Sequence, residues 1–138
     1  MRAIFFYGLF MDQSVLAGKG LHPDVLGPAV LSDYRIHIGH RATLLPAPGH
    51  RAYGVVMELA SDEARVLYAE PSVREYVAER VRVERLDSGG VIEADCYNLP
   101  RGTGVGGTNP TYANALSRLV ESLGFDAGYV REVAAFGD

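Results

Sequence analysis

Apolar and polar residues alternate over several stretches of the chain, and this alternation is the period of a half-buried β-strand. The expected strands are Arg2–Tyr7, Val30–Ile38, Tyr53–Leu59, Val77–Leu86 and Val91–Leu99. Gly89 and Gly90 separate the last two strands, which predicts a β-hairpin. The first strand ends at Gly8, where a tight turn is expected.

Helical spacing of apolar residues is clearest near the C-terminal end. Pro110 begins a predicted helix that ends before Gly124, and a shorter helix is expected over Ala127–Ala134. A short helix is also expected over Met11–Ala17, with Asp12 in its first turn.

A further helix is expected to begin after Ser61, which is a good N-cap residue, and to run to about Ala69. Pro71 disfavours the helical conformation for the residue that precedes it. Glu70 is therefore expected at the exit of this helix.

Two stretches have no sustained period and are expected to be loops. Gly39–His50 contains Pro46 and Pro48, and Pro100–Asn109 is rich in glycine. Strands outnumber helices and several are joined by short turns. The sequence therefore predicts an α+β fold, a small mixed and mostly antiparallel barrel-like sheet with flanking helices, as one domain over residues 1–138.

Composition narrows the classes of protein to which the chain can belong. A hydrophobic content of 48% with 22% charged residues is typical of a folded globule. The net charge of -4 and the scattered basic residues argue against nucleic acid as a partner. No apolar run reaches the length of a membrane span and the first residues are unlike a signal peptide, so a cytoplasmic protein without a membrane partner is expected. Cys96 is the only cysteine, which excludes an internal disulfide and a cysteine-based zinc site.

Two features carry candidate chemistry. The turn Tyr7-Gly8-Leu9-Phe10 offers backbone N–H groups at the start of a helix, where anions bind well, although a core strand that ends in a tight turn is the commoner explanation. Glu70 lies among apolar or constrained neighbours, which favours a partly desolvated carboxyl that takes and gives a proton. A solvated surface charge is the simpler interpretation of any single glutamate.

Other constellations are weaker. Gly102–Gly107 matches a dinucleotide fingerprint, but no βαβ unit surrounds it, so a loop that covers a pocket or an inert surface loop is expected. His37, His40 and His50 lack the spacing of metal ligands and no acidic cluster completes a shell, so no metal and no cofactor are expected. Arg41 has a planar fork suited to a substrate carboxylate, although a solvated loop arginine is commoner.

Four segments, taken in order, resemble the γ-glutamylcyclotransferase-like family, which includes plant avirulence-induced proteins. They are the first strand with Tyr7-Gly8, the run Ala52–Leu59, Glu70 with Tyr76 and the strand Val77–Val83, and the segment Ala94–Tyr97. Each motif is short, and the resemblance rests on their order and spacing over residues 2–97.

The resemblance implies a function for these residues. In that family the glutamate that matches Glu70 is the general acid/base, and the turn at Tyr7-Gly8-Leu9-Phe10 is the pocket for the charged end of the glutamyl group. It also implies that Tyr76 and Tyr97 point toward the same interior as Glu70. The implied substrate is a small γ-glutamyl compound and the implied product is 5-oxoproline.

The chain departs from the family pattern at two places. Leu9 stands where Ser or Thr usually follows Tyr-Gly, so this position has no side-chain hydroxyl and only backbone hydrogen-bond donors remain. Pro71 and Ser72 follow Glu70, where Gly is common. Two alternatives therefore stay open: a non-catalytic module that binds a small carboxylate in the same pocket, and an amide hydrolase or transferase in which Glu70 activates water.

Overall fold

The computed structural model describes residues 1–138, and its strands close into a barrel in the order β1-β3-β2-β4-β5. The elements in chain order are β1 (Arg2–Phe6), the 3-10 turn η1 (Leu9–Met11), α1 (Gln13–Ala17), β2 (Asp24–Ile38), β3 (Ala42–Leu59), α2 (Ser61–Leu67), β4 (Val77–Arg85), β5 (Val91–Asn98), α3 (Pro110–Ser122) and α4 (Ala127–Ala135). The predicted α+β class with a small, mostly antiparallel barrel is confirmed.

The predicted hairpin of the last two strands is confirmed. β4 pairs antiparallel with β5 from Val77 opposite Asn98 to Glu84 opposite Val91. β1 is antiparallel to β3 and parallel to β5, so it lies between them and closes the barrel. Because β1 leads directly into Tyr7 and Gly8, this closure fixes the position of the first turn.

The prediction of a loop over Gly39–His50 is wrong. β3 begins at Ala42 and continues through both prolines, paired with β2 up to Ile38 opposite Ala42. β2 is the only strand that pairs with β3 beside the prolines, so this part of β3 is a sheet edge, where a proline whose nitrogen faces away from the partner strand is tolerated. Asp33, with φ at +65°, marks an irregularity in β2, and its carboxylate accepts the Gly49 N–H at 3.0 Å. β2 also begins earlier than expected, at Asp24.

The two helices in the N-terminal half of the chain, α1 and α2, are shorter than expected. In place of one helix over Met11–Ala17, η1 is followed by α1, and Asp12 is the N-cap of α1, because its carboxylate accepts the Ser14 N–H at 2.9 Å. The predicted N-cap role of Ser61 is also wrong, since α2 begins at that residue and Glu63 accepts the N–H of the residue before it. α2 ends at Leu67, before the expected Ala69.

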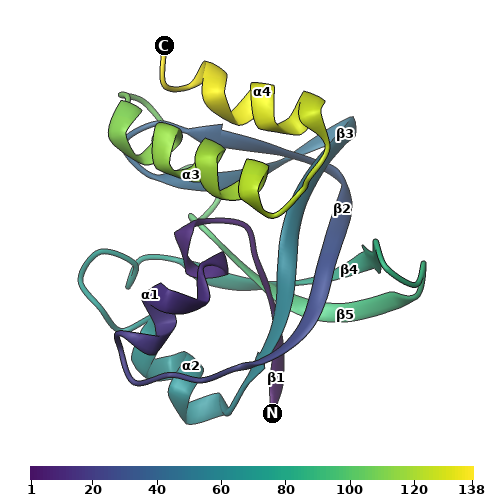
Figure 1. Cartoon of the computed structure of the whole chain (residues 1–138). Helices are drawn as coiled ribbons and strands as arrows, with labels where there is room; N and C mark the ends of the chain where they lie inside the picture. Colours follow the sequence, from purple (N-terminus) through teal and green to yellow (C-terminus); the bar gives the residue numbers. More distant parts are fainter.

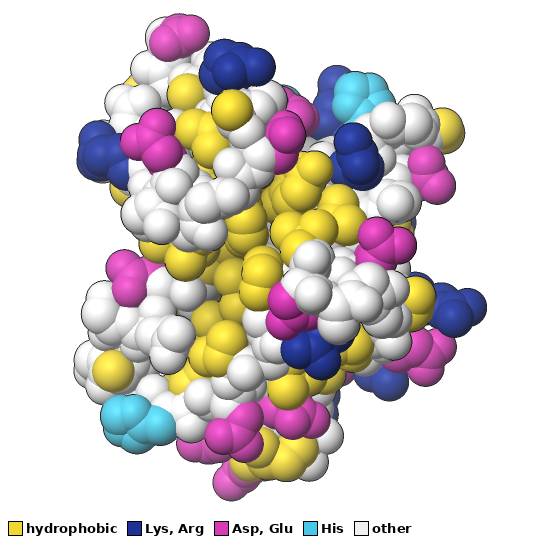
Figure 2. Space-filling model, turned by 45° about the vertical axis from the view of Figure 1, so that its right-hand side comes forward, with side chains coloured by type: hydrophobic (Ala, Val, Ile, Leu, Met, Phe, Trp, Pro, Cys, Tyr) yellow, Lys and Arg dark blue, Asp and Glu magenta, His cyan; other side chains and the backbone are white.

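Helices α3 and α4 lie side by side over the outer part of β2 and β3, while α1 and α2 lie near the other end of the barrel (Figure 1). Tyr53 of β3 packs on Tyr129 of α4 with ring centroids 4.9 Å apart, and His37 of β2 meets Phe136 at 5.6 Å. Fully buried side chains fill the interior, among them Phe5, Ile36, Met57, Val83 and Leu116. Figure 2 shows further hydrophobic side chains along the middle of one face, bordered by charged ones.

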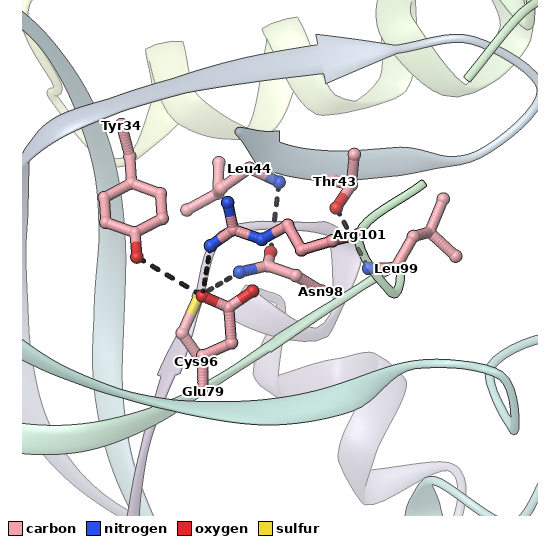
Figure 3. Close-up of polar contacts among 8 residues, drawn as sticks. All are labelled: Tyr34, Thr43, Leu44, Glu79, Cys96, Asn98, Leu99 and Arg101. Carbon is pink, nitrogen blue, oxygen red and sulfur yellow. Dashed lines mark hydrogen bonds and ion pairs between the residues drawn. The ribbon is translucent and has the colours of Figure 1, made fainter. Parts of the chain in front are cut away.

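A cluster of hydrogen-bonded polar side chains lies between β2, β3, β4 and β5 (Figure 3). The Asn98 amide is fully buried; its oxygen accepts the Leu44 N–H at 3.0 Å and its nitrogen donates to the Cys96 sulfur at 3.5 Å. Burial raises the pKa of the Cys96 thiol. Beside them, Glu79 accepts hydrogen bonds from Tyr34 and Arg101. Asn98 therefore joins β5 to the start of β3.

Asn98→Leu is expected to lower the free energy of unfolding by about 1–3 kcal/mol, because it leaves the buried Leu44 N–H without an acceptor. Chemical denaturation of the variant and the wild type measures the difference. A change below about 0.5 kcal/mol, the size usual for surface substitutions, would contradict this role.

None of the helices combines the length and apolar character that crossing a membrane requires.

Candidate active site

A mostly apolar cavity of about 460 Å³ lies where η1, the turns after α2 and the start of α3 meet. The structure brings all seven residues that the sequence singled out to this one cavity: Tyr7, Gly8, Leu9, Phe10, Glu70, Tyr76 and Tyr97. Its volume suits a small molecule. The chemical role of each residue stays a prediction.

Hydrogen bonds hold the Tyr7-Gly8 turn at both of its residues. The buried Tyr7 hydroxyl donates to the Tyr97 carbonyl oxygen at 2.7 Å, which ties the turn to β5. The Gly8 carbonyl accepts the Met11 N–H at 3.0 Å and so begins η1. The N–H groups at the start of a helical turn have no acceptor within it. The turn can therefore present backbone donors to a ligand.

Tyr112, which the sequence did not single out, reaches this turn from α3. Its hydroxyl lies against Gly8 so closely that a Cβ on Gly8 would stand 2.5 Å from it. Burial raises the pKa of the Tyr112 phenol, while a hydrogen bond from the Leu9 backbone opposes that rise. The phenol thus keeps its proton and remains a donor at neutral pH. The only sequence signal was its place in the first turn of the helix that Pro110 begins.

Glu70 follows α2 at the exit that Pro71 predicts. Its carbonyl accepts the Val73 N–H at 3.0 Å, and this turn carries the side chain to the wall of the cavity. The Lys19 ammonium contacts both carboxylate oxygens, at 2.7 and 2.9 Å. The Glu70 side chain is 35% exposed, so its surroundings are more polar than its sequence neighbours suggested. As a carboxylate beside the cavity it is placed to accept a proton.

Aromatic rings form the wall between Glu70 and the first turn. Tyr68 stacks on Tyr97 with centroids 3.7 Å apart and planes 7° apart, and Phe10 meets Tyr68 edge-on at 5.9 Å. The Tyr76 hydroxyl donates to the Ala42 carbonyl at 2.5 Å. Tyr68 was missed by sequence analysis because a tyrosine at a helix end has no distinctive pattern. These contacts fix the chain on both sides of Glu70.

The glycine-rich segment after β5 packs on the turn between β2 and β3. The His40 N–H donates to the Gly106 carbonyl at 3.1 Å, and the His37 ring contacts the Val105 carbonyl at 2.7 Å. Gly39 allows this approach, since a Cβ there would meet the Val105 oxygen at 2.4 Å. No cluster of three potential metal-ligating side chains occurs in the structure.

Arg41 lies beside this segment and also lines the cavity. Its guanidinium contacts the exposed Glu75 at 3.1 Å. Exposed pairs of this kind are weak, so Arg41 retains donors that a ligand can engage.

Comparisons with known proteins agree with this arrangement. The family model described as gamma-glutamyl cyclotransferase, AIG2-like matches residues 4–115. No curated protein sequence matches the chain.

Solved structures share the whole fold. A gamma-glutamyl cyclotransferase superposes with a TM-score of 0.81 at 18% identity, over 97% of this chain and 86% of that one. An uncharacterized Homo sapiens protein gives 0.80 at 18% identity, with the same coverage. YkqA from Bacillus subtilis gives 0.80 at 20% identity, over 99% of this chain and 54% of its own. Identities of this size establish the fold alone.

Proposed function

The chain belongs to the AIG2-like gamma-glutamyl cyclotransferase family, and from this premise we propose that it releases 5-oxoproline from a γ-glutamyl-amine compound by intramolecular aminolysis. The observation that carries the proposal is the placement of the Glu70 carboxylate and the Tyr7-Gly8-Leu9-Phe10 turn on one cavity.

The reaction needs little from the protein beyond proton transfer and orientation. A γ-glutamyl compound contains its own nucleophile, the α-amine, at the distance that closes a five-membered ring on the γ-carbonyl. No serine or cysteine nucleophile is required, because the attack is intramolecular once the substrate is folded correctly. The aromatic walls of the cavity favour that folded conformation.

Each wall of the cavity has a role in this scheme. Glu70 takes a proton from the α-ammonium, and in its protonated form it is the acid available to the departing amine. The turn after Tyr7 holds the glutamyl carboxylate or the oxyanion through its N–H groups, and the Tyr112 hydroxyl adds a side-chain donor beside Leu9. This donor takes the place of the hydroxyl that Leu9 lacks.

Purified protein is expected to release 5-oxoproline from at least one member of a panel of γ-glutamyl amides, including glutathione, free γ-glutamyl dipeptides and γ-glutamyl alkylamines. Chromatography with mass detection measures the product. Release of free glutamate instead would favour the hydrolase alternative, in which Glu70 activates water. No product from any member, with a small carboxylate still bound tightly, would favour the binding module.

A further inference from the structure

The proposed cyclisation moves two protons, which is more than one carboxylate can hold at a time. The substrate α-nitrogen begins as an ammonium with three hydrogens and ends in the lactam with one. The departing nitrogen must gain a proton as its bond to carbon breaks, because an alkylamide anion is a very poor leaving group. A second proton-transferring group near Glu70 would serve this need.

Lys19 occupies that position. Its Nζ lies 2.7 and 2.9 Å from the two Glu70 oxygens and 5.9 Å from the centre of the Phe10 ring. Both charged side chains line the cavity and are about one-third exposed, at 32% for Lys19 and 35% for Glu70. The pair joins segments 51 residues apart in sequence. Its location is therefore the wall of the active site rather than the general surface.

The choice of lysine is itself informative. Lys19 is the only lysine in the chain, where the other twelve of the 13 basic residues are arginines. An arginine would form a comparable ion pair, but it does not give up its proton in proteins, whereas a lysine ammonium does so in a suitable environment. The only lysine of the chain thus contacts the candidate general base.

We propose that Lys19 is a second catalytic residue, the general acid that protonates the leaving nitrogen as its bond to carbon breaks, while Glu70 activates the α-amine and returns its proton to the amine once it is released. This inference rests on the proposed function. Lysine is suited to this task because its proton affinity is close to that of an alkylamine leaving group.

The proton transfers balance in four steps. The Glu70 carboxylate removes one proton from the α-ammonium, and the free amine attacks the γ-carbonyl to form the ring C–N bond and an oxyanion. The oxyanion collapses, the bond to the leaving nitrogen breaks with its electron pair on that nitrogen, and Lys19 donates a proton there. Neutral Lys19 removes the second proton from the ring nitrogen. Protonated Glu70 then gives its proton to the released amine, so both side chains return to their starting states.

Two substrates of similar size separate this role from simple positioning of Glu70. γ-Glutamylbenzylamide releases a basic amine that needs protonation, whereas γ-glutamyl-p-nitroanilide releases a weakly basic amine that depends on it far less. Lys19→Met and Lys19→Arg are each expected to lower kcat/KM on the benzylamide by about 10²-fold or more and to change it only a few-fold on the nitroanilide. Thermal melting controls for folding.

Lys19→Arg is the decisive variant, because it keeps the positive charge beside Glu70 and removes only the ability to release a proton. Wild-type rates on the benzylamide with Lys19→Arg would overturn the proposal, and so would equal losses on both substrates with either variant. A wild type that cyclises neither compound nor any member of the wider panel would instead refute the proposed function itself.

Discussion

Glu70→Gln is expected to lower kcat/KM for 5-oxoproline release by about 10³-fold, within the range usual for a general acid/base. The amide keeps the size of the side chain. It removes the proton acceptor that Lys19 contacts at the wall of the cavity. Stability should change by less than about 1 kcal/mol, since the ion pair is partly exposed. Steady-state kinetics and chemical denaturation separate the two effects.

Glu75→Gln is the matched control. Glu75 precedes Tyr76 in the same turn region, carries the same charge and is 62% exposed, with Arg41 as its partner. Its replacement is expected to leave turnover within a few-fold of the wild type. Comparable activity in the Glu70 and Glu75 variants would show that Glu70 is a surface charge and not the acid/base.

Gly8→Ala is expected to lower kcat/KM by about 10²-fold, because the new methyl group would stand 2.5 Å from the Tyr112 hydroxyl. Either the ring or the turn must move, and the backbone N–H donors of the turn move with it. The Gly8 backbone is extended, with φ at −105°, so alanine meets a steric conflict there and not a backbone one. Kinetics of purified Gly8→Ala measure the loss.

Combining Gly8→Ala with Tyr112→Phe tests the cause of that loss. Removing the phenol oxygen relieves the clash, so the double variant should be less impaired than the two single losses together predict. Gly104→Ala is the control, since a Cβ there meets nothing within 4 Å. Strictly additive losses would mean that the hydroxyl and the turn do not interact.

Alternation was sufficient to predict at least part of each barrel strand, because each strand has one face toward the interior. Val81 and Val83 are buried as expected, and the β4–β5 hairpin follows. The prolines at 46 and 48 misled the prediction for β3, because the rule against proline in strands depends on whether a neighbouring strand needs its N–H, and that is known only from the sheet. The starts of α1 and α2 depended instead on which nearby carboxylate, Asp12 or Glu63, caps the helix.

The candidate site likewise contains residues that the sequence could identify and residues that only the fold reveals. Glu70 and the first turn could be found from local features and from the resemblance to the family. Lys19 and Tyr112 could not, because their significance lies in contacts with Glu70 and Gly8 that only the fold creates. A lysine between two glycines and a tyrosine in a helix have no pattern of their own.

The most direct test of intramolecular aminolysis is whether an oxygen atom from water enters the product. A γ-glutamyl amide that the protein consumes should be incubated in H₂¹⁸O and its products examined by mass spectrometry. Intramolecular aminolysis predicts 5-oxoproline without ¹⁸O, since no water enters the ring. Glutamate with ¹⁸O in its γ-carboxylate would contradict the account and identify water as the nucleophile.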